Sequence, residues 1–324
     1  MNTSQKIIKY IREHKQASGK ELSDYIPHIT PRAIRKQLKK LFEKGILTKV
    51  GKPPQVFYLL AVNHTHPSPV IPIKSVQNII NERYLFVTAK GESIYGWSGF
   101  VAWCNKTKQD PSKTAKEYIA TLRRYDSLKT QGIINGLPKI QKTFAKVFLD
   151  KLFYLDFYSI ERFGKTKLGQ LLLYAKQSQS IPLIHQLTDQ IRPQIMRIIK
   201  KYKVDGVLFI PPTVKREIQL MKELEKRLNL SVRKISATKI KTEIIVPQKT
   251  LSKLEDRVEN AQYTIIVSDK HKFANILIID DAVGSGATLN ETARQIKTKG
   301  VVSGKIIGLA ITGSFKGFDV ISEV

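Results

Sequence analysis

Two adjacent carboxylates, Asp280 and Asp281, follow an unbroken aliphatic run near the C-terminal end of this sequence. The run, residues 276–279, has the composition of a parallel strand buried on both faces. A glycine-rich turn follows at 284–286, and the free N–H groups of such a turn, together with a helix N-terminus, suit a phosphate. Neighbouring carboxylates repel each other unless hydroxyls or a cation lie between them. The order of residues therefore predicts a site for a sugar phosphate with vicinal hydroxyls, with or without Mg²⁺.

The residues after the turn predict a helix. Thr288 and Glu291 have capping-box spacing, which places a helix N-terminus at Thr288. Two commoner nucleotide motifs fit less well, because no lysine precedes Thr288 as in a Walker loop and Leu289 stands where a dinucleotide fingerprint needs its third glycine. The alternative is an ordinary buried strand with an acidic turn and a capped helix.

The pattern aliphatic run–Asp–Asp–x–x–Gly–x–Gly–x–Thr resembles the phosphoribosyl-pyrophosphate (PRPP) motif of type I phosphoribosyltransferases. The resemblance implies that Asp280 and Asp281 contact the ribose hydroxyls, close to a Mg²⁺ ion that arrives with PRPP. It also implies a PRPP-binding loop. The loop would run from the acids through Ala282, Val283, Gly284, Ser285, Gly286, Ala287 and Thr288.

A second loop, 211–217, follows a predicted strand at 206–210, so it would lie at the same edge of a parallel sheet. The resemblance places a pyrophosphate-binding loop there. Its members would be Pro212, Thr213, Lys215 and Arg216. The N-terminus of a helix predicted over 213–228 would assist the two cations. A plain turn with exposed charges is the alternative.

Residues 246–261 lie between two predicted strands, and their length and polarity predict a mobile loop over the site. Lys249, Lys253 and Arg257 would neutralise charge that develops during ribosyl transfer, so Lys249 and Arg257 join the acids as candidate catalytic residues. The segment resembles Pro-Gln…Leu-Ser…Glu-x-Arg-x-Glu-Asn of the ComF family, phosphoribosyltransferase-like proteins linked to DNA uptake in competent bacteria. Residues 158–176 also resemble the segment with which that family's domain begins. The resemblance therefore covers about residues 150–324. The family's four-cysteine zinc finger and its Arg-Gly-Phe-Asn sequence have no counterpart here.

Composition points to a polyanionic partner. The 324 residues carry 55 Lys and Arg against 27 Asp and Glu, a net charge of +28, which favours nucleic acid. A lysine-rich proteome is the alternative. Cys104 is the only cysteine, which excludes internal disulfides and a multi-cysteine zinc site. The sequence has neither a secretory h-region nor eighteen consecutive apolar residues, so a cytoplasmic protein with no membrane partner is expected.

Residues 1–62 resemble a winged helix-turn-helix domain. Three helices are predicted, the third opening at Thr30-Pro31 with Ile34, Leu38, Leu41 and Phe42 on its apolar face, and strands at 46–50 and 56–60 follow. The third helix would enter the major groove of double-stranded DNA. The candidate DNA contacts are Arg32, Arg35, Lys36, Lys39 and Lys40 on this helix and Lys49 and Lys52 on the wing. A winged helix that binds protein is the alternative.

The expected fold class is α/β, a type I phosphoribosyltransferase-like parallel sheet flanked by helices, preceded by the winged helix and a small middle region. Residues 63–78 are a Pro-rich linker. Residues 79–149 are a mixed α+β region with strands at 84–88, 93–95 and 100–103 and a helix over 112–128, and residues 150–324 form the phosphoribosyltransferase-like domain. Further helices are predicted over 168–176 and 187–201 and further strands over 231–235 and 305–311.

Three functions follow from this organisation. The chain is a ComF-like protein that binds PRPP and DNA, acting in DNA uptake or processing or as a PRPP-responsive regulator. Alternatively, it is an active transferase that passes ribose 5-phosphate from PRPP to a nucleobase or amine. The third is a PRPP-sensing repressor of nucleotide metabolism, by likeness of architecture to a purine-operon repressor of Gram-positive bacteria. The sequence leaves open the acceptor, the DNA site and the oligomeric state, a homodimer included.

Overall fold

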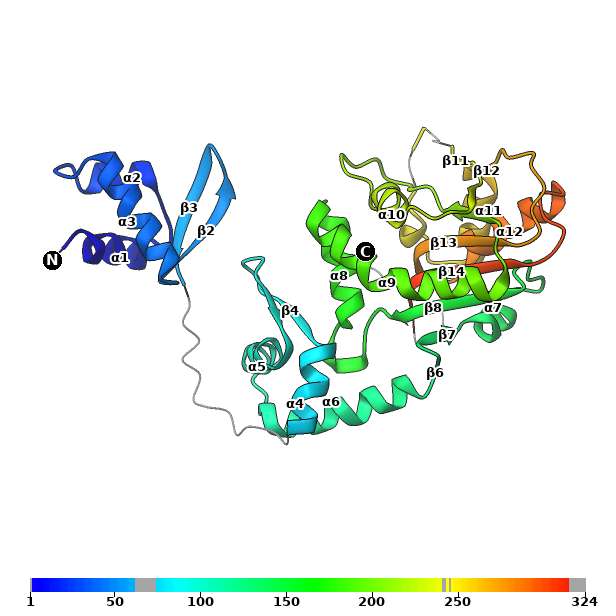
Figure 1. Cartoon of the computed structure of the whole chain (residues 1–324), viewed down its shortest axis with the longest axis horizontal. Coiled ribbons are helices and arrows are strands. Elements are labelled where there is room, and N and C mark those ends of the chain that lie inside the picture. The colour runs from blue at the N-terminus through cyan, green and yellow to red at the C-terminus, as the bar shows by residue number, and fades with distance from the viewer. Residues whose placement is uncertain (1, 62–73, 241–242, 245, 315–324) are drawn as a thin grey trace. The chain divides into compact units, whose positions relative to one another are not determined.

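The computed structural model describes residues 2–61, 74–240, 243–244 and 246–314, with the backbone alone at Lys52 and Lys249 (Figure 1). The chain divides into two compact units, residues 1–68 and 69–324. Most of the predicted linker, 63–78, lies outside the described residues, but its last part is helical because α4 begins at Lys74.

The first unit is a small α+β body. Between residues 2 and 61 it comprises α1 (Thr3–His14), β1 (Ala17–Ser18), α2 (Gly19–Tyr25), α3 (Pro31–Glu43), β2 (Leu47–Lys52) and β3 (Gln55–Leu60). The strands form an antiparallel sheet in the order β1-β3-β2. A capping box at Ser18 and Glu21 starts α2, and the Thr30 hydroxyl accepts from the N–H of Ala33 to start α3.

The core of this unit contains one face of α3. Ile34, Leu38 and Leu41 are buried against α1, α2 and β2. Phe42, predicted on this face, is instead 49% exposed. The helical period explains the error, because Phe42 lies about 100° beyond Leu41, on the same side as Arg35 and Lys39.

A mostly parallel sheet is the centre of the second unit. Its seven strands among the described residues have the order β10-β9-β13-β14-β8-β7-β6. The parallel members are β10 (Arg233–Lys234), β9 (Gly206–Phe209), β13 (Ile276–Val283), β14 (Ile306–Gly313) and β8 (Lys151–Phe157). The antiparallel members are β7 (Ile133–Asn135) and β6 (Lys129–Thr130). The predicted strand 231–235 is therefore shorter than expected.

Both faces of the sheet are covered, as the aliphatic run in β13 predicts. Ile276 and Ile278 belong to one core, and Leu277 and Ile279 belong to the other. The first core includes residues of α12 (Ala287–Thr298) and α7 (Leu137–Thr143). The second includes residues of α8 (Lys167–Gln177), α9 (Ile181–Tyr202) and α10 (Leu220–Leu228). The coarse α/β class is thus confirmed.

Residues 79–149 do not form a separate region. They contribute α4 (Lys74–Arg83), β4 (Leu85–Val87), β5 (Ser93–Tyr95), α5 (Gly96–Lys106), α6 (Pro111–Asp126), β6, β7 and α7. The predicted boundary at 149/150 is wrong because β7 pairs with β8 and residues from both sides share one core. The predicted strands at 84–88 and 93–95 and the helix over 112–128 are confirmed.

The predicted strand at 100–103 is wrong, because these residues lie inside α5. Phe100, Val101 and Cys104 are buried on one helical face, where Phe100 packs edge-on against Tyr84. A short apolar run is compatible with either a strand or a buried helix, and here tertiary packing selects the helix.

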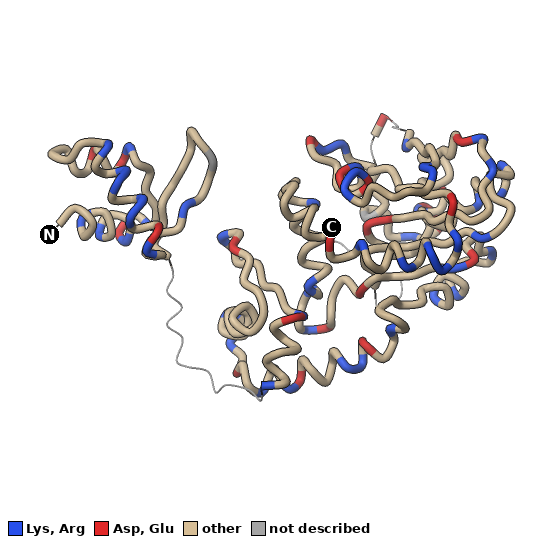
Figure 2. The backbone as a smooth tube through the Cα atoms, viewed as in Figure 1, with Lys and Arg blue, Asp and Glu red and all other residues tan. Residues whose placement is uncertain are grey.

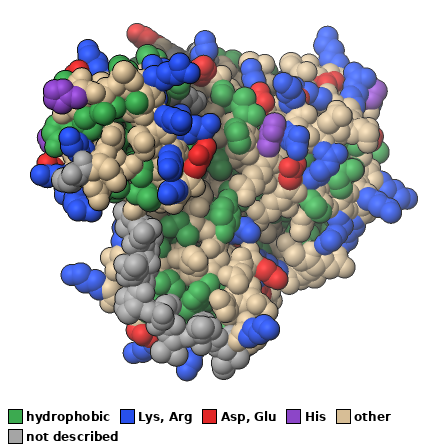
Figure 3. Space-filling model, turned by 60° about the vertical axis from the view of Figure 1, so that its left-hand side comes forward, with side chains coloured by type: hydrophobic (Ala, Val, Ile, Leu, Met, Phe, Trp, Pro, Cys, Tyr) green, Lys and Arg blue, Asp and Glu red, His purple; other side chains and the backbone are tan. Residues whose placement is uncertain are grey.

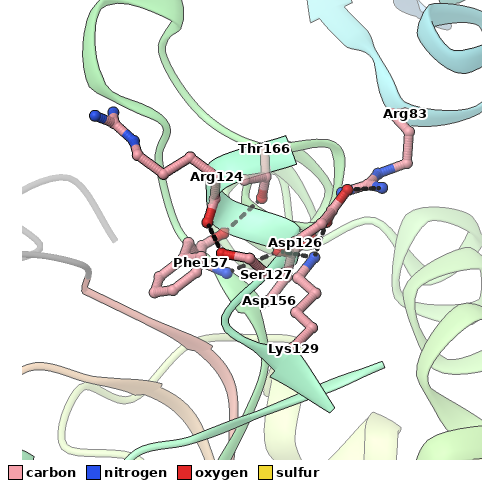
Figure 4. A network of polar contacts seen from close by, with 8 residues as sticks. All are labelled: Arg83, Arg124, Asp126, Ser127, Lys129, Asp156, Phe157 and Thr166. Atoms are coloured by element: carbon pink, nitrogen blue, oxygen red, sulfur yellow. Dashed lines mark hydrogen bonds and ion pairs between the residues drawn. The ribbon is translucent and has the colours of Figure 1, made fainter. Parts of the chain in front are cut away.

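A network of charged side chains joins this region to the end of β8 (Figure 4). Arg83 of α4 donates two hydrogen bonds to Asp126 of α6, at 2.9 and 3.0 Å. Lys129 of β6 lies 3.5 Å from the Asp126 carboxylate and 2.6 Å from that of Asp156 in β8. The N–H of Phe157 also donates to Asp156, at 2.9 Å. These contacts connect four elements at one edge of the sheet.

The remaining elements lie between β10 and β13. They are β11 (Ala237–Lys239), β12 (Ile265–Val267), which pairs with β11 in an antiparallel ribbon, and α11 (Leu254–Thr264). No helix in the described part of the chain is both long enough and apolar enough to span a membrane.

Candidate functional site

A cavity of about 230 Å³ lies at the carboxyl ends of β9 and β13. Its wall is formed by residues 280–289, by most of the loop 210–219 with the first two residues of α10, and by Lys176, Lys239, Pro247, Gln248 and Arg257. Parallel sheets place their ligand sites at this edge, since the loops that leave neighbouring strands meet there. All the residues predicted for the PRPP loop, Asp280 to Thr288, line this cavity.

The glycine turn has a shape that only glycine permits at one position. Gly286 has a φ of +85°, and a Cβ there would lie 2.8 Å from Cδ1 of Ile140 in α7. Within the described residues, the N–H groups of Gly284, Ser285 and Gly286 donate to no acceptor. Together with the first turn of α12, the turn forms a cradle of amide donors for an anion.

The predicted capping box at Thr288 is wrong. Gly286 is the N-cap, and α12 begins at Ala287, whose N–H donates to the Ser285 hydroxyl at 3.3 Å. Thr288 is therefore a residue of the first turn, with its side chain beside the cavity. Glu291 is buried and accepts hydrogen bonds of 2.7 to 3.0 Å from Arg294. The left-handed conformation of Gly286 starts the helix earlier than the capping pattern suggests.

The two acids are linked by a backbone hydrogen bond, and two lysines lie in the same cavity. The N–H of Asp281 donates to Oδ1 of Asp280 at 2.8 Å. The ammonium of Lys176, at the end of α8, forms an ion pair with Oδ2 of Asp281. Lys239, at the end of β11, lines the same cavity and donates to the Thr213 hydroxyl at 2.6 Å.

Burial dominates the electrostatics of this site. It raises the pKa of Asp280 to about 7, with the charge of Asp281 as the second cause and the two lysines acting in the opposite direction. Burial also lowers the pKa of Lys239, although both acids oppose this shift. The hydroxyl groups of a ligand could donate hydrogen bonds to Asp280 in addition to the one from the N–H of Asp281.

A divalent cation does not fit this set of side chains. Mg²⁺ binds oxygen ligands, whereas the two carboxylates here are already accompanied by two ammonium groups. Within the described residues, no group of three or more His, Cys, Asp and Glu side chains could hold a metal ion. The expected Mg²⁺, which would arrive with PRPP, would therefore depend on oxygens of that ligand rather than on a set of protein ligands.

The predicted pyrophosphate residues are only partly gathered. Pro212 and Thr213 line the cavity, and so does Arg216, whose Nη1 donates to the backbone oxygen of Lys176 at 2.8 Å. Lys215 instead lines an adjoining cavity of about 370 Å³. The helix predicted from Thr213 begins at Leu220, so its N-terminus does not follow the loop directly.

The predicted mobile loop, 246–261, contains a short 3-10 helix (Gln248–Thr250) and the first part of α11. Residues from Leu254 onward form α11, in which Arg257 is buried and its Nε donates to the backbone oxygen of Leu251 at 2.7 Å. Arg257 and Gln248 line the cavity, and Gln248 donates to the backbone oxygen of Arg257 at 2.8 Å. The side chain of Lys249 lies outside the described residues, and Lys253 is exposed at the start of α11.

Sequence reasoning assigned no role to Lys176, Lys239 or Gln248. Lys176 lies 105 positions from Asp281 along the chain. The acid pair does predict that some cation approaches, but 55 basic residues leave that cation unidentified. Only the fold selects the partner.

The basic residues of α3 form an exposed face opposite the core of the first unit (Figure 2). The exposed members are Arg32, Arg35, Lys36, Lys39 and Lys40, and Lys49 of β2 is also exposed. Lys39 has a weak pairing with Glu43 at 3.8 Å. The side chain of Lys52 lies outside the described residues. In Figure 3, many more basic than acidic side chains stand out from the visible surface.

Comparison with known proteins identifies no relative. No family model matches the sequence, and a search of curated proteins finds no match either.

Proposed function

We propose that the second unit binds a ribose 5-phosphate group, with PRPP as the ligand class. One observation carries the proposal: the acid pair and the amide cradle at the start of α12 line the same cavity. Carboxylates accept hydrogen bonds from vicinal hydroxyls, and free amides at a helix N-terminus donate to a phosphate. The two functions lie side by side because β13 leads directly into the turn.

The size of the cavity supports a small ligand. Pockets for drug-sized molecules are about 300–1,000 Å³, and this one is about 230 Å³. The part of the ligand assigned to this space is the ribose 5-phosphate group. The mostly parallel sheet, with the acids at its carboxyl edge, also agrees with the type I phosphoribosyltransferase-like architecture that the motif predicts.

Ligand binding is better supported than ribosyl transfer. A leaving pyrophosphate needs several cations aimed at one place. Here the guanidinium of Arg216 is hydrogen-bonded to the end of α8, and Lys215 lines the other cavity. We therefore favour a ComF-like PRPP-binding protein that acts in DNA uptake or processing, or as a PRPP-responsive regulator, over an active transferase.

Isothermal titration calorimetry with PRPP tests the binding. The wild-type protein should release heat, and Asp280→Asn combined with Asp281→Asn should weaken binding at least 100-fold. The matched control is Glu255→Gln with Asp256→Asn, which removes two adjacent exposed carboxylates from α11. Absence of heat with the wild-type protein contradicts the proposal.

A pyrophosphate-release assay across a panel of nucleobases and amines separates transfer from binding. We expect no release above background from a protein that binds PRPP. Release that depends on one acceptor and on both acids would instead establish the transferase.

The first unit has its own proposed partner, double-stranded DNA. Three helices followed by a two-stranded hairpin agree with the winged helix that the sequence suggests, and the exposed face of α3 carries five basic residues. Each Lys or Arg that neutralises a phosphate steepens the dependence of binding on salt. The third helix and the wing would therefore contact the phosphate backbone.

A mobility-shift assay tests this contact. Arg35→Ala with Lys39→Ala should weaken binding and reduce the salt slope by about 2. The control is Lys6→Ala with Lys9→Ala on α1, which removes the same charge and a similar exposed pairing, Lys9 with Glu13 at 4.0 Å. Equal losses in both variants would contradict a specific role for α3. Repeating the assay with PRPP tests the repressor alternative, in which ligand and DNA alter each other's affinity.

A further inference from the structure

We infer that this site uses its own lysines in place of a divalent cation, so that it binds a ribose phosphate without Mg²⁺. The inference rests on the proposed function and concerns its cofactor requirement. Lys176 is the resident cation, and Lys239 is the second positive charge in the same cavity.

Lys176 supplies a positive charge directly to one of the two acids. Its ammonium contacts Oδ2 of Asp281, with 25% of the lysine side chain and 16% of the aspartate side chain exposed. This pair is much less exposed than the surface pair of Lys39 and Glu43, at 77% and 61%. The charge on Asp281 is therefore balanced before any ligand arrives.

Neighbouring contacts fix the place of Lys176. Arg216 holds its backbone oxygen at 2.8 Å, and the N–H of Ile218 donates to the side chain of Gln179 at 3.0 Å, just beyond the helix. The loop that the sequence assigns to pyrophosphate thus fastens the end of α8. Since the helix end is held, the ammonium is presented to Asp281 from a rigid support.

Lys239 adds a second positive charge to the cavity that holds the acids. It is partly buried, bonded to Thr213 and close enough to both acids for their charges to act on it. A divalent ion entering between the acids would meet repulsion from two ammonium groups. A neutral hydroxyl meets none, and it can donate to Asp280 while Lys176 stays on Asp281.

Ribose 5-phosphate is the suitable probe because, unlike PRPP, it has no pyrophosphate to bind Mg²⁺ by itself. Calorimetric titrations in EDTA and in millimolar Mg²⁺ should give wild-type Kd values that agree within about twofold. Lys176→Met should bind at least tenfold more weakly in EDTA and recover in Mg²⁺, because the vacated position then admits the ion. Lys176→Arg should retain metal-independent binding.

A thermal shift gives a second readout without ligand. Mg²⁺ should raise the Tm of Lys176→Met but leave unchanged the Tm of the wild type and of Lys226→Met, an exposed control on α10. Loss of wild-type binding in EDTA overturns the inference and leaves the proposed function intact. Absence of binding in both buffers is instead a failure of the proposed function. If Lys176→Met does not fold, the wild type and Lys176→Arg decide the question.

Discussion

The central sheet carries two clusters of acids and bases at the same edge, and one of them lines the cavity described above. Asp126 and Asp156 are paired with Arg83 and Lys129 around the end of β8. Asp280 and Asp281 are accompanied by Lys176 and Lys239 at the end of β13. In strand register, Thr312 of β14 lies between the two clusters, opposite Asp156 on one side and Ala282 on the other. Counting charges does not distinguish these clusters.

One acid in each cluster has a shifted pKa, and the two shifts have opposite directions. Burial raises the pKa of Asp126, but the hydrogen bonds and charge of Arg83, with Lys129, outweigh it and leave that pKa below its ordinary value. Burial raises the pKa of Asp280, with Asp281 adding to the shift. The first cluster satisfies its acids internally, whereas the second leaves one acid short of partners beside an open space. That shortage is what makes the second cluster suitable for a ligand.

Among the substitutions, the largest loss of stability is expected from removing one lysine. Lys129→Met should lower the free energy of unfolding by about 3 kcal/mol, because it removes the ion-pair partner of the mostly buried Asp156. Urea denaturation measures the change, with exposed Lys305→Met as the control. A loss equal to that of the control would mean that water reaches Asp156.

The pH dependence of stability should carry the signature of Asp280. Its folded pKa of about 7 lies above the unfolded value of 3.8, so the folded protein holds an extra proton between these limits. The stability that this proton contributes is complete below pH 4 and is lost as the pH rises to 7, by up to about 4 kcal/mol at about 1.4 kcal/mol per pKa unit. Urea denaturation from pH 4.5 to 8 measures this, and Asp280→Asn should flatten the profile. Asp126 acts oppositely, since its contribution is lost only as the pH falls through its lowered pKa. An unchanged profile in Asp280→Asn would assign the titration to another group.

Lys176→Met repeats the change made at Lys129 in the cluster beside the cavity. We expect a loss of only about 1 kcal/mol, because water in the cavity can hydrate the Asp281 carboxylate. The same denaturation series compares the two variants directly. Equal losses would show that both clusters are structural and that the cluster beside the cavity is not specially suited to a ligand.

The smallest effect is expected between the clusters, at Thr312. Its hydroxyl is fully buried and has no hydrogen-bond partner among the described residues. Thr312→Val keeps the shape and removes the unsatisfied group, so stability should rise by about 0.5 kcal/mol. A loss of 1 kcal/mol or more, measured by thermal denaturation, would mean that the hydroxyl bonds to a water linking the two clusters.

Local patterns predicted the strand, the turn and the order of chemical groups in the site. The run 276–279 specified a strand buried on both faces, and the glycines specified the turn at 284–286. The strand and the turn depend on residues that are adjacent in the chain, so they can be predicted from local sequence. The start of α12 was misplaced because capping spacing and a left-handed glycine compete at the same few residues.

Features that depend on distant contacts could not be predicted. The helical pattern from Thr213 gives way to a loop, where Gln219 donates to the backbone oxygens of Val214 and Arg216 and Gln179 accepts from Ile218. Arg216 was assigned to pyrophosphate from its place in the loop. Its hydrogen-bond partner on α8 was missed because that residue lies forty positions away in the sequence. Local propensity does not contain such partners, and tertiary contacts override it.

The proximity of Gly286 to Ile140 determines where a fragment that keeps the cavity can begin. The turn proposed to bind an anion lies against Ile140 of α7, which precedes β8 in sequence. A fragment beginning at residue 150 would lose α7, and it would also expose the edge of β8 that β7 covers. Exposed strand edges promote aggregation. A fragment designed to keep the proposed ligand site should therefore include α7 and its neighbouring strands. Recombination at residue 150 would separate the glycine turn from α7.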